Sequence, residues 1–349
     1  MNDCWQEKDV QLPFLLGELH LGALHLRGMV VNHGLHPRYG LKVPELPPAV
    51  EVAVIRSHPL SCAFPDYVGS AAAFRYVPDR YHRCYVNLQQ TLADYLKKFT
   101  SKSRYTLLKK VRRLTTASGG AIVMREFTRP QQMDEFLSLA REISTKTYQE
   151  RLLHAGIPDD PAFVAEMGSL AARDAVRAYT LFLHDHPVAY MYCAAVEASD
   201  LMYRFVGHDP EYGRFSPGVV LQYLALERLF QEQRFAFLDF AEGTGMHKVF
   251  FSTGSMACAD VYYFRDTPRY RALVALHAAL RHTSRTASAV SEALGIKRGL
   301  KRLLREGTAA IVPSGGKKAT AVVPLHPDSD LAAEPMESSL RSKTVKSSS

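Results

Sequence analysis

The chain has 349 residues, 47% of them hydrophobic and 22% charged, which is the composition of a globular protein with room for two modest domains. It holds no run of 18 or more apolar residues, and its start, MNDCWQEKDV, is too polar for a signal peptide, so we expect a cytoplasmic protein. The five cysteines are far apart and form no CxxC pair, which argues against a disulfide framework and a zinc site.

The net charge of +8 is concentrated in two segments. Residues 97–113 hold eight Lys or Arg and no acid, and residues 265–305 hold ten Lys or Arg against two acids. Such runs are most often solvated helix faces, but they also bind ligand phosphates, RNA or an anionic membrane surface. We expect no DNA partner. For the basic helices over 267–306 we favour packing on the protein and keep peripheral membrane contact as the alternative.

Residues 1–120 are predicted to form an N-terminal α/β region that ends in a basic helix. The alternation of apolar residues over 18–31 predicts a hairpin, and residues 51–55 and 83–88 are typical of strands. At the other end, residues 307–349 are rich in Pro, Gly, Ser and Lys, which predicts a disordered tail.

From residue 121 the elements follow one another clearly. The pattern predicts, in order, a strand at 121–127, helices at 132–148 and 161–173, strands at 177–183, 188–196 and 201–207, a helix at 217–233, a strand at 234–240, a short helix at 246–251 and a strand at 258–264. Short turns make the three successive strands antiparallel. The helix at 217–233 crosses over between its two flanking strands, so we expect those two strands to be parallel.

The segment GRFSPGVV at 213–220 leads into that crossover helix. Ser216 suits an N-cap, Pro217 the first helical position, and Gly218 a close approach of another group. Backbone N–H groups at 218–220 should be left unpaired in the first turn, where the positive end of the helix dipole favours a phosphate. The alternative is an ordinary helix cap that binds nothing.

This order of elements, with SPGVVLQY, then LDFAEG and then Lys248, resembles the GNAT acyltransferase superfamily in its CelD- and Fem-related branch. The resemblance covers about residues 100–265. It implies an α/β (α+β) fold with a mixed central sheet flanked by helices, in which 121–266 is the acyltransferase domain and the N-terminal region is a candidate degenerate tandem copy. It also implies an acyl-CoA co-substrate, by expectation acetyl-CoA, and no metal.

Fem-type relatives use aminoacyl-tRNA in place of acyl-CoA, so the resemblance leaves two donors open. The glycine spacing before the crossover helix differs from that of the wider superfamily. The resemblance places the donor phosphates at the start of this helix, on Arg214, Ser216, Gly218, Val219 and Val220.

Asp239 is the first candidate for a general base. The period of two along the strand at 234–240 puts it on one face with Phe235 and Phe237, where burial would raise its pKa toward a base's working range. A structural Asp that accepts N–H bonds from the following turn is the alternative, with Glu242 as the alternative base. Lys248 is expected either to stabilise the donor phosphate or the leaving thiolate, or to pair with one of these carboxylates.

Further candidates concern the acceptor. Two cations of the basic helix are expected to hold an acidic acceptor or a phosphate near the cleft, two strand tyrosines to line that cleft, and a histidine beside the helix start to relay protons. These residues are Lys102, Arg104, Tyr190, Tyr203 and His208. The alternatives are a solvated helix face, core tyrosines and a passive histidine.

We therefore expect an N-acyltransferase that moves an acetyl group from acetyl-CoA to an amine, directly within a ternary complex. The expected acceptor is a small molecule or glycan precursor, such as an amino sugar or a cell-envelope polysaccharide precursor. The first alternative is Fem-like aminoacyl transfer, with tRNA bound on the basic segments. The second is a non-catalytic protein of this fold that binds a membrane or a synthase.

Overall fold

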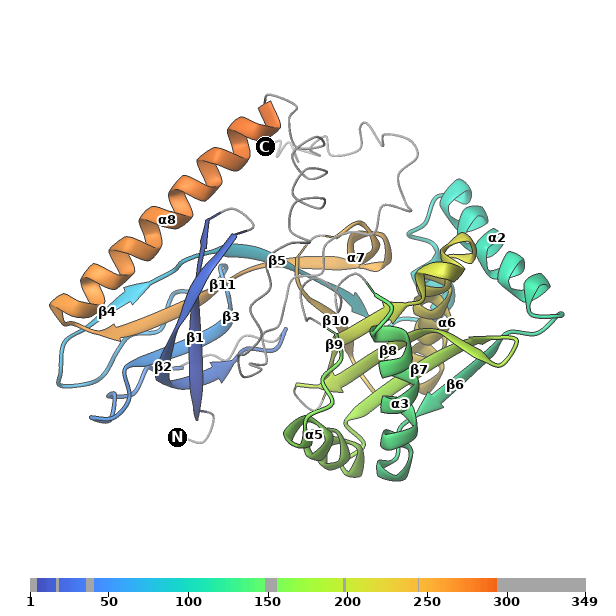
Figure 1. Cartoon of the computed structure of the whole chain (residues 1–349), viewed down its shortest axis with the longest axis horizontal. Helices are drawn as coiled ribbons and strands as arrows, with labels where there is room; N and C mark the ends of the chain where they lie inside the picture. The colour runs from blue at the N-terminus through green and yellow to red at the C-terminus, as the bar shows by residue number, and fades with distance from the viewer. Residues whose placement is uncertain are drawn as a thin grey trace, which may run out of the picture.

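The chain is described here from a computed structural model, which covers residues 5–16, 19–35, 41–147, 156–196, 199–243 and 245–293. Eleven strands form one mixed sheet in the order β1-β2-β3-β11-β5-β10-β9-β8-β7-β6, and β4 pairs with β11 (Figure 1). The strands are β1 (Gln6–Leu16), β2 (Leu19–Asn32), β3 (Val52–Pro59), β4 (Ala73–Tyr76), β5 (Arg80–Asn87), β6 (Val123–Phe127), β7 (Val176–Leu183), β8 (His186–Ala195), β9 (Asp200–His208), β10 (Phe237–Glu242) and β11 (Gly254–Arg265).

The second half of the sheet, β6 to β10, has helices on both faces (Figure 1). One face is covered by α3 (Met133–Ser144) and α5 (Pro161–Ala172), which share a core with Tyr190 and Tyr192 of β8. The other face is covered by α1 (Leu92–Leu96), α2 (Ser101–Ala117), α6 (Pro217–Glu232) and α7 (Met246–Phe251). The mixed α/β fold expected from the sequence is therefore confirmed.

The strand order in this half also agrees with the expectation. β7, β8 and β9 are antiparallel neighbours, and β9 and β10 are parallel with α6 between them in the chain. Antiparallel neighbours need only short turns, whereas a parallel pair requires the helical crossover.

The first half consists of β1 to β4 and part of β11, with α8 (Pro268–Ala293) against one face. Within the described part of residues 5–91 there is no helix, so the helices of the expected N-terminal α/β region are α1 and α2 alone. The hairpin predicted within 18–31 is wrong: β2 is one strand of 14 residues that pairs with β1. β2 then pairs in parallel with β3, a contact between separate segments that the local pattern does not report.

Helix α8 packs on the first half, as expected for the start of the basic segment 267–306. Tyr270 is buried with Leu273 and Val274 packed beside it, and Nε2 of His277 lies 3.0 Å from the carbonyl oxygen of Pro13. Residues 294–306 and the tail predicted at 307–349 lie outside the described residues. No helix in the described part of the chain is long and apolar enough to span a membrane.

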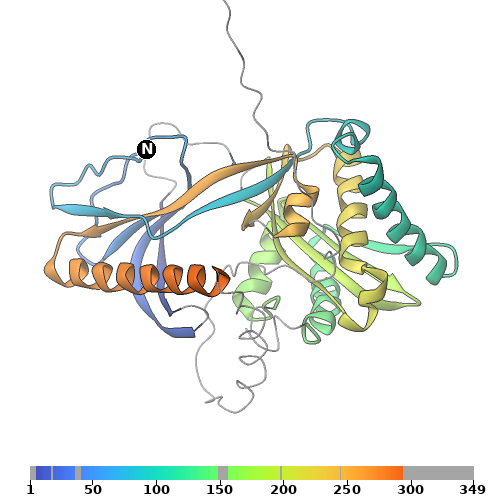
Figure 2. The same ribbon diagram turned by 90° about the horizontal axis from the view of Figure 1, so that it is seen from above.

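Strands β5 and β11 run through both halves, as Figure 2 shows from above. β11 pairs with β3 and β4 in the first half and with β5 along the seam, while β5 also pairs with β10. Helices α1 and α2 pack in the core under α6. The packing therefore does not follow the domain limits expected at 120 and 266, because strands and helices from both sides of these limits build the same layers.

Candidate functional site

The sheet opens between β9 and β10 at the end where α6 begins. Within the described residues the two strands pair only over Phe237–Asp239 and Asp200–Met202, although β9 continues to His208. The pairing of β10 with β5 also shifts register beyond Asp239, and Ala241 has a positive φ of 57°. The edge of β9 that faces β10 is thus open beyond Met202, so its backbone groups can bond to a ligand.

The start of α6 lies beside this opening. Pro217 begins the helix, but Ser216 has a φ of 52° and its side chain makes no capping hydrogen bond, so the predicted side-chain cap is wrong. The N–H of Val220 donates to the carbonyl oxygen of Ser216 at 3.1 Å, which also corrects the expectation that this N–H is unpaired. Pro217 has no N–H, so the groups left for an anion are the N–H groups of Gly218 and Val219.

Two guanidinium groups lie near the ring of Phe215, two residues before the first residue of this helix. The guanidinium of Arg214 lies 4.8 Å from the ring centroid of Phe215, and that of Arg113 lies 5.6 Å from the same centroid. Arg214 was expected here, whereas Arg113 was not singled out, because α2 meets this turn only in the folded chain. The two cations and the positive end of the α6 dipole make this corner suitable for a phosphate.

His208 also lies at this corner. A Cβ built on Gly218 would lie 3.6 Å from Nδ1 of His208, so the glycine allows the end of β9 to approach α6. The next residue, Asp209, is 1% exposed and accepts from the N–H of Glu211 at 3.0 Å and from Nζ of Lys146 at 2.8 Å. Asp209 therefore caps the turn that follows β9.

Both carboxylate oxygens of Asp239 accept bonds from neighbouring groups. It is 1% exposed, it forms an ion pair with the equally buried Arg83, and its Oδ1 accepts from the N–H of Ala241 at 2.8 Å. Of the expected aromatic face, Phe237 lies in β10 on the same side as Asp239, but Phe235 precedes the strand and lies in the core under α6. This geometry fits the structural alternative for Asp239 better than the role of a base.

Glu242 has surroundings that suit a general base. Its carboxyl is partly buried, and burial together with the nearby Asp260 raises its pKa, against smaller opposing effects of Lys248 and Arg56. A raised pKa brings a carboxylate closer to the range in which it accepts a proton effectively near neutral pH. Of the two predicted carboxylates, Glu242 is the better placed.

The first half of the sheet, together with β5, supplies the groups around Glu242. Arg56 is ion-paired with Asp260, whose Oδ1 accepts from the hydroxyl of Tyr81 at 2.7 Å and from the N–H of Ser57 at 2.9 Å. Ser57 has a φ of 57°, a conformation that costs free energy for a residue other than glycine. Sequence reasoning missed this cluster because its members come from β3, β5 and β11, and no spacing along the chain connects them.

Lys248 lies behind Glu242. It is 2% exposed, and its Nζ donates to the carbonyl oxygen of Glu242 at 2.5 Å. Burial lowers its pKa to about 8, although the charge of Glu242 acts in the opposite direction. This contact is to the backbone of Glu242, so the expected pairing of Lys248 with a carboxylate stays a prediction.

The remaining predicted residues are not gathered in one place. Arg104 donates to the carbonyl oxygen of Leu96 at 2.8 Å, and nine residues of helix put it about 14 Å from Arg113. Lys102 is exposed in the first turn of the same helix, so neither of these two cations lies at the α6 corner.

The two predicted tyrosines lie on opposite faces of the sheet. Tyr190 is 2% exposed in the core under α3 and α5, whereas Tyr203 is in the core under α6, on the open part of β9. The ring centroid of Tyr203 lies 6.5 Å from that of His247, which sequence reasoning missed. Burial lowers the pKa of His247 to about 4, so its ring is neutral at physiological pH.

The burial of Lys248 predicts how stability depends on pH. Its pKa falls from 10.5 to about 8 on folding, so between these values the unfolded chain binds more protons and the free energy of unfolding rises with pH. We expect the free energy of unfolding of Lys248→Met, measured by urea denaturation, to rise less between about pH 8 and pH 10 than that of the wild type.

Lys97→Met is the matched control for this experiment, because the side chain of Lys97 is 75% exposed. The Lys97→Met variant should retain the wild-type slope. If the free energy of unfolding of Lys248→Met rises with pH as steeply as that of the wild type, the lowered pKa of Lys248 is contradicted.

Comparison with known proteins bears on the fold and the family. Residues 101–249 match the family described as Acetyltransf_6, acetyltransferase (GNAT) domain. No curated protein matches the chain. Among solved structures, FemX is similar at 9% identity with a TM-score of 0.50, over 78% of this chain and 91% of FemX.

Two further structures are similar with lower scores. L-PGS from Bacillus licheniformis matches at 10% identity with a TM-score of 0.43, over 77% of this chain and 88% of that one. A conserved protein of unknown function from Bacteroides thetaiotaomicron VPI-5482 matches at 9% identity with a TM-score of 0.38, over 56% of this chain and 62% of the length of that protein.

The open strand pair beside a helix start lies in the segment that matches the family. Residues 101–249 are therefore a GNAT-type acetyltransferase domain, in a chain whose fold is similar to that of FemX.

Proposed function

We propose that the protein is an N-acyltransferase that transfers an acyl group, by expectation acetyl, from acyl-CoA to an amine. The observation that carries this proposal is the opening between β9 and β10 beside the start of α6. The N–H groups of Gly218 and Val219, with Arg214 and Arg113, would hold the donor phosphates. From there the rest of the donor would extend along the open edge of β9.

The transfer depends on two groups, the carboxylate of Glu242 on β10 and a backbone N–H of the open edge of β9. Glu242 takes a proton from the acceptor ammonium, and the freed amine nitrogen attacks the thioester carbon. The nitrogen loses its second proton as the carbon–sulfur bond breaks, and the released CoA thiolate takes up this proton. An N–H of the open edge at 205–207 donates to the thioester oxygen as it gains negative charge. Alignment of the reactants would contribute about 7 kcal/mol or more, and the N–H donor about 3 kcal/mol.

The acceptor is proposed to bind on the side of Glu242 that faces the first half of the sheet. There Asp260 and Glu242 provide two carboxylates that attract a cationic amine, while Arg56 and Tyr81 can bond to hydroxyl or carbonyl oxygens. This combination suits a polar amine such as an amino sugar or a cell-envelope polysaccharide precursor.

A second candidate is aminoacyl transfer from tRNA. It is favoured by the fold similarity to FemX over 78% of this chain and by the exposed cations along α2. In this case α2 would contact the RNA backbone, and binding would weaken steeply as salt is added.

The roles of the two carboxylates can be separated by amide substitutions. We expect Glu242→Gln to lower kcat/KM at least about a hundredfold without lowering the melting temperature, because it removes the base. We expect Asp239→Asn to lower the free energy of unfolding by about 3 kcal/mol, because Arg83 then stays buried without its ion-pair partner. Steady-state kinetics and urea denaturation measure the two effects.

The pH profile provides the control for this pair. In the wild type, kcat/KM should rise with pH through a pKa above the ordinary 4.5 of a glutamate, since the base must be ionised, and Glu242→Gln should lose this rise. A stable but inactive Asp239→Asn, together with an active Glu242→Gln, would reverse the two assignments.

The donor site is tested by binding of acetyl-CoA, free CoA and charged tRNA, measured as shifts in melting temperature and as Kd. Arg113→Ala and Arg214→Ala should each weaken acetyl-CoA binding about five- to tenfold, the typical contribution of one charge-assisted contact. Arg112→Ala is the matched control, since Arg112 is an exposed neighbour on α2 with no contact to Phe215 among the described residues.

Each outcome of the donor test discriminates between the candidates. Stabilisation by charged tRNA alone would reject acyl-CoA as the donor and favour the aminoacyl transferase. Failure of all three to bind would reject both enzymes.

A further inference from the structure

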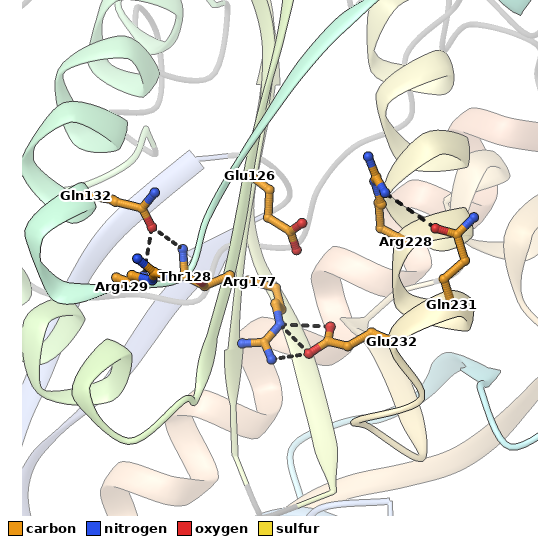
Figure 3. A pocket seen from close by; sticks show the side chains of 8 residues that line it. All are labelled: Glu126, Thr128, Arg129, Gln132, Arg177, Arg228, Gln231 and Glu232. Carbon is orange, nitrogen blue, oxygen red and sulfur yellow. Dashed lines mark hydrogen bonds and ion pairs between the residues drawn. The ribbon is translucent and has the colours of Figure 1, made fainter.

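A cavity of about 640 Å³ lies at the other end of α6, where the helix meets β6 and β7 (Figure 3). Helix α6 has 16 residues, which puts this cavity about 24 Å from the donor corner. Its lining comes from β6 and the loop after it, from β7 and from the last turns of α6, namely Glu126, Thr128, Arg129, Gln132, Arg177, Arg228, Gln231 and Glu232. The proposed transfer uses none of these residues.

One wall of the cavity is held rigidly. Arg177 is 3% exposed, forms ion pairs with Glu232 and Asp174, and donates to the carbonyl oxygen of Val176 at 2.7 Å. The side-chain oxygen of Gln132 accepts from the N–H groups of Thr128 and Arg129, each at 3.0 Å. The bonds of Arg177 join β7 to α6, and the bonds of Gln132 fix the loop after β6, so both parts of the lining are ordered before any ligand arrives.

Three charged groups of the lining have no ion-pair partner among the described residues: Glu126, Arg129 and Arg228. In Figure 3 the carboxylate of Glu126 points into the space between β6 and α6. Glu126 lies at the exposed side of the cavity. Partial burial of its carboxyl and the nearby Glu232 raise its pKa, while Arg177, Arg228 and the hydroxyl of Tyr179 act in the opposite direction, and a positive group placed between the two carboxylates would be stabilised. Arg228 makes only a long contact of 3.5 Å with Gln231.

A buried hydroxyl lies below Glu126. Tyr179 is the direct cross-strand neighbour of Glu126 on β7, so both side chains lie on the face of the sheet that α6 covers. Tyr179 is fully buried, and its hydroxyl lies close enough to the carboxyl of Glu126 to favour the charged form of that carboxyl. An ammonium group placed at this carboxylate would therefore meet a negative charge.

We propose that this cavity binds a small zwitterion of amino-acid to dipeptide size, with its ammonium on Glu126 and its carboxylate on Arg228 and Arg129. A ligand with negative charge alone would be repelled by Glu126 and Glu232, and one with positive charge alone by the two arginines. A ligand with both charges matches a lining that presents groups of both signs, and the volume is within the range of small-molecule sites.

Isothermal titration of the full chain with three matched probes tests this proposal: alanylglutamine, its N-acetyl form and its C-terminal amide. The free dipeptide should bind, and each blocked form should bind about tenfold more weakly or worse, because each lacks one charge-assisted contact. Glu126→Gln should weaken binding of the free dipeptide by about the same factor. Glu135→Gln is the matched control, because Glu135 is an exposed partner of Arg125 outside the cavity.

A second variant tests the opposite end of the ligand. Arg228→Met should reduce or abolish the preference for the free dipeptide over its amide while keeping the wild-type melting temperature. The proposal is overturned if the free dipeptide gives no heat at millimolar concentration, if the three probes bind equally, or if Glu126→Gln binds like the wild type.

Discussion

The separation of β9 from β10 is the constraint on which the rest of the site depends. Over Phe237–Asp239, β10 pairs with both β9 and β5, and beyond Asp239 it pairs only with β5, at Glu242 and Arg83. Asp239 lies where the strands part, bonded to Arg83 of β5 and to the N–H of Ala241. The ion pair with Arg83 joins β10 to β5, and the bond from Ala241 fixes the bend of β10 beyond Asp239. In this account the buried ion pair keeps the sheet open and takes no part in proton transfer.

The first half of the sheet completes the surroundings of Glu242. β5 and β11 cross the seam, and with β3 they bring Arg56, Tyr81 and Asp260 to the end of β10. Asp260 raises the pKa of Glu242, while Arg56 and Lys248 limit the effect. A GNAT-type domain alone would lack this cluster. The shared strands therefore give the first half a direct chemical role beyond covering one edge of the sheet.

The order of elements after residue 121 could be predicted because each strand and helix has its own local periodicity. The parallel β9–β10 pair and the position of the α6 start followed from connection rules that need only this order. What could not be predicted depends on contacts between distant segments. Arg113 reaches Phe215, and Arg83 reaches Asp239, only after the sheet has assembled.

Backbone detail was a second source of error. The free N–H of Val220 and the capping side chain of Ser216 were expected from average helix starts. The left-handed conformation of Ser216 changes both. Likewise, a start of β10 only three residues later than expected moved Phe235 away from the face of Asp239.

Amide hydrogen exchange with and without acetyl-CoA tests the central claim most directly, because it reports on the backbone groups of the open strand edge and the helix start. The account predicts that acetyl-CoA slows exchange at residues 205–207 and at Gly218 and Val219, and leaves the C-terminal turn of α6 unchanged. Unchanged exchange at both of the first two places, with the ligand bound elsewhere, would contradict it.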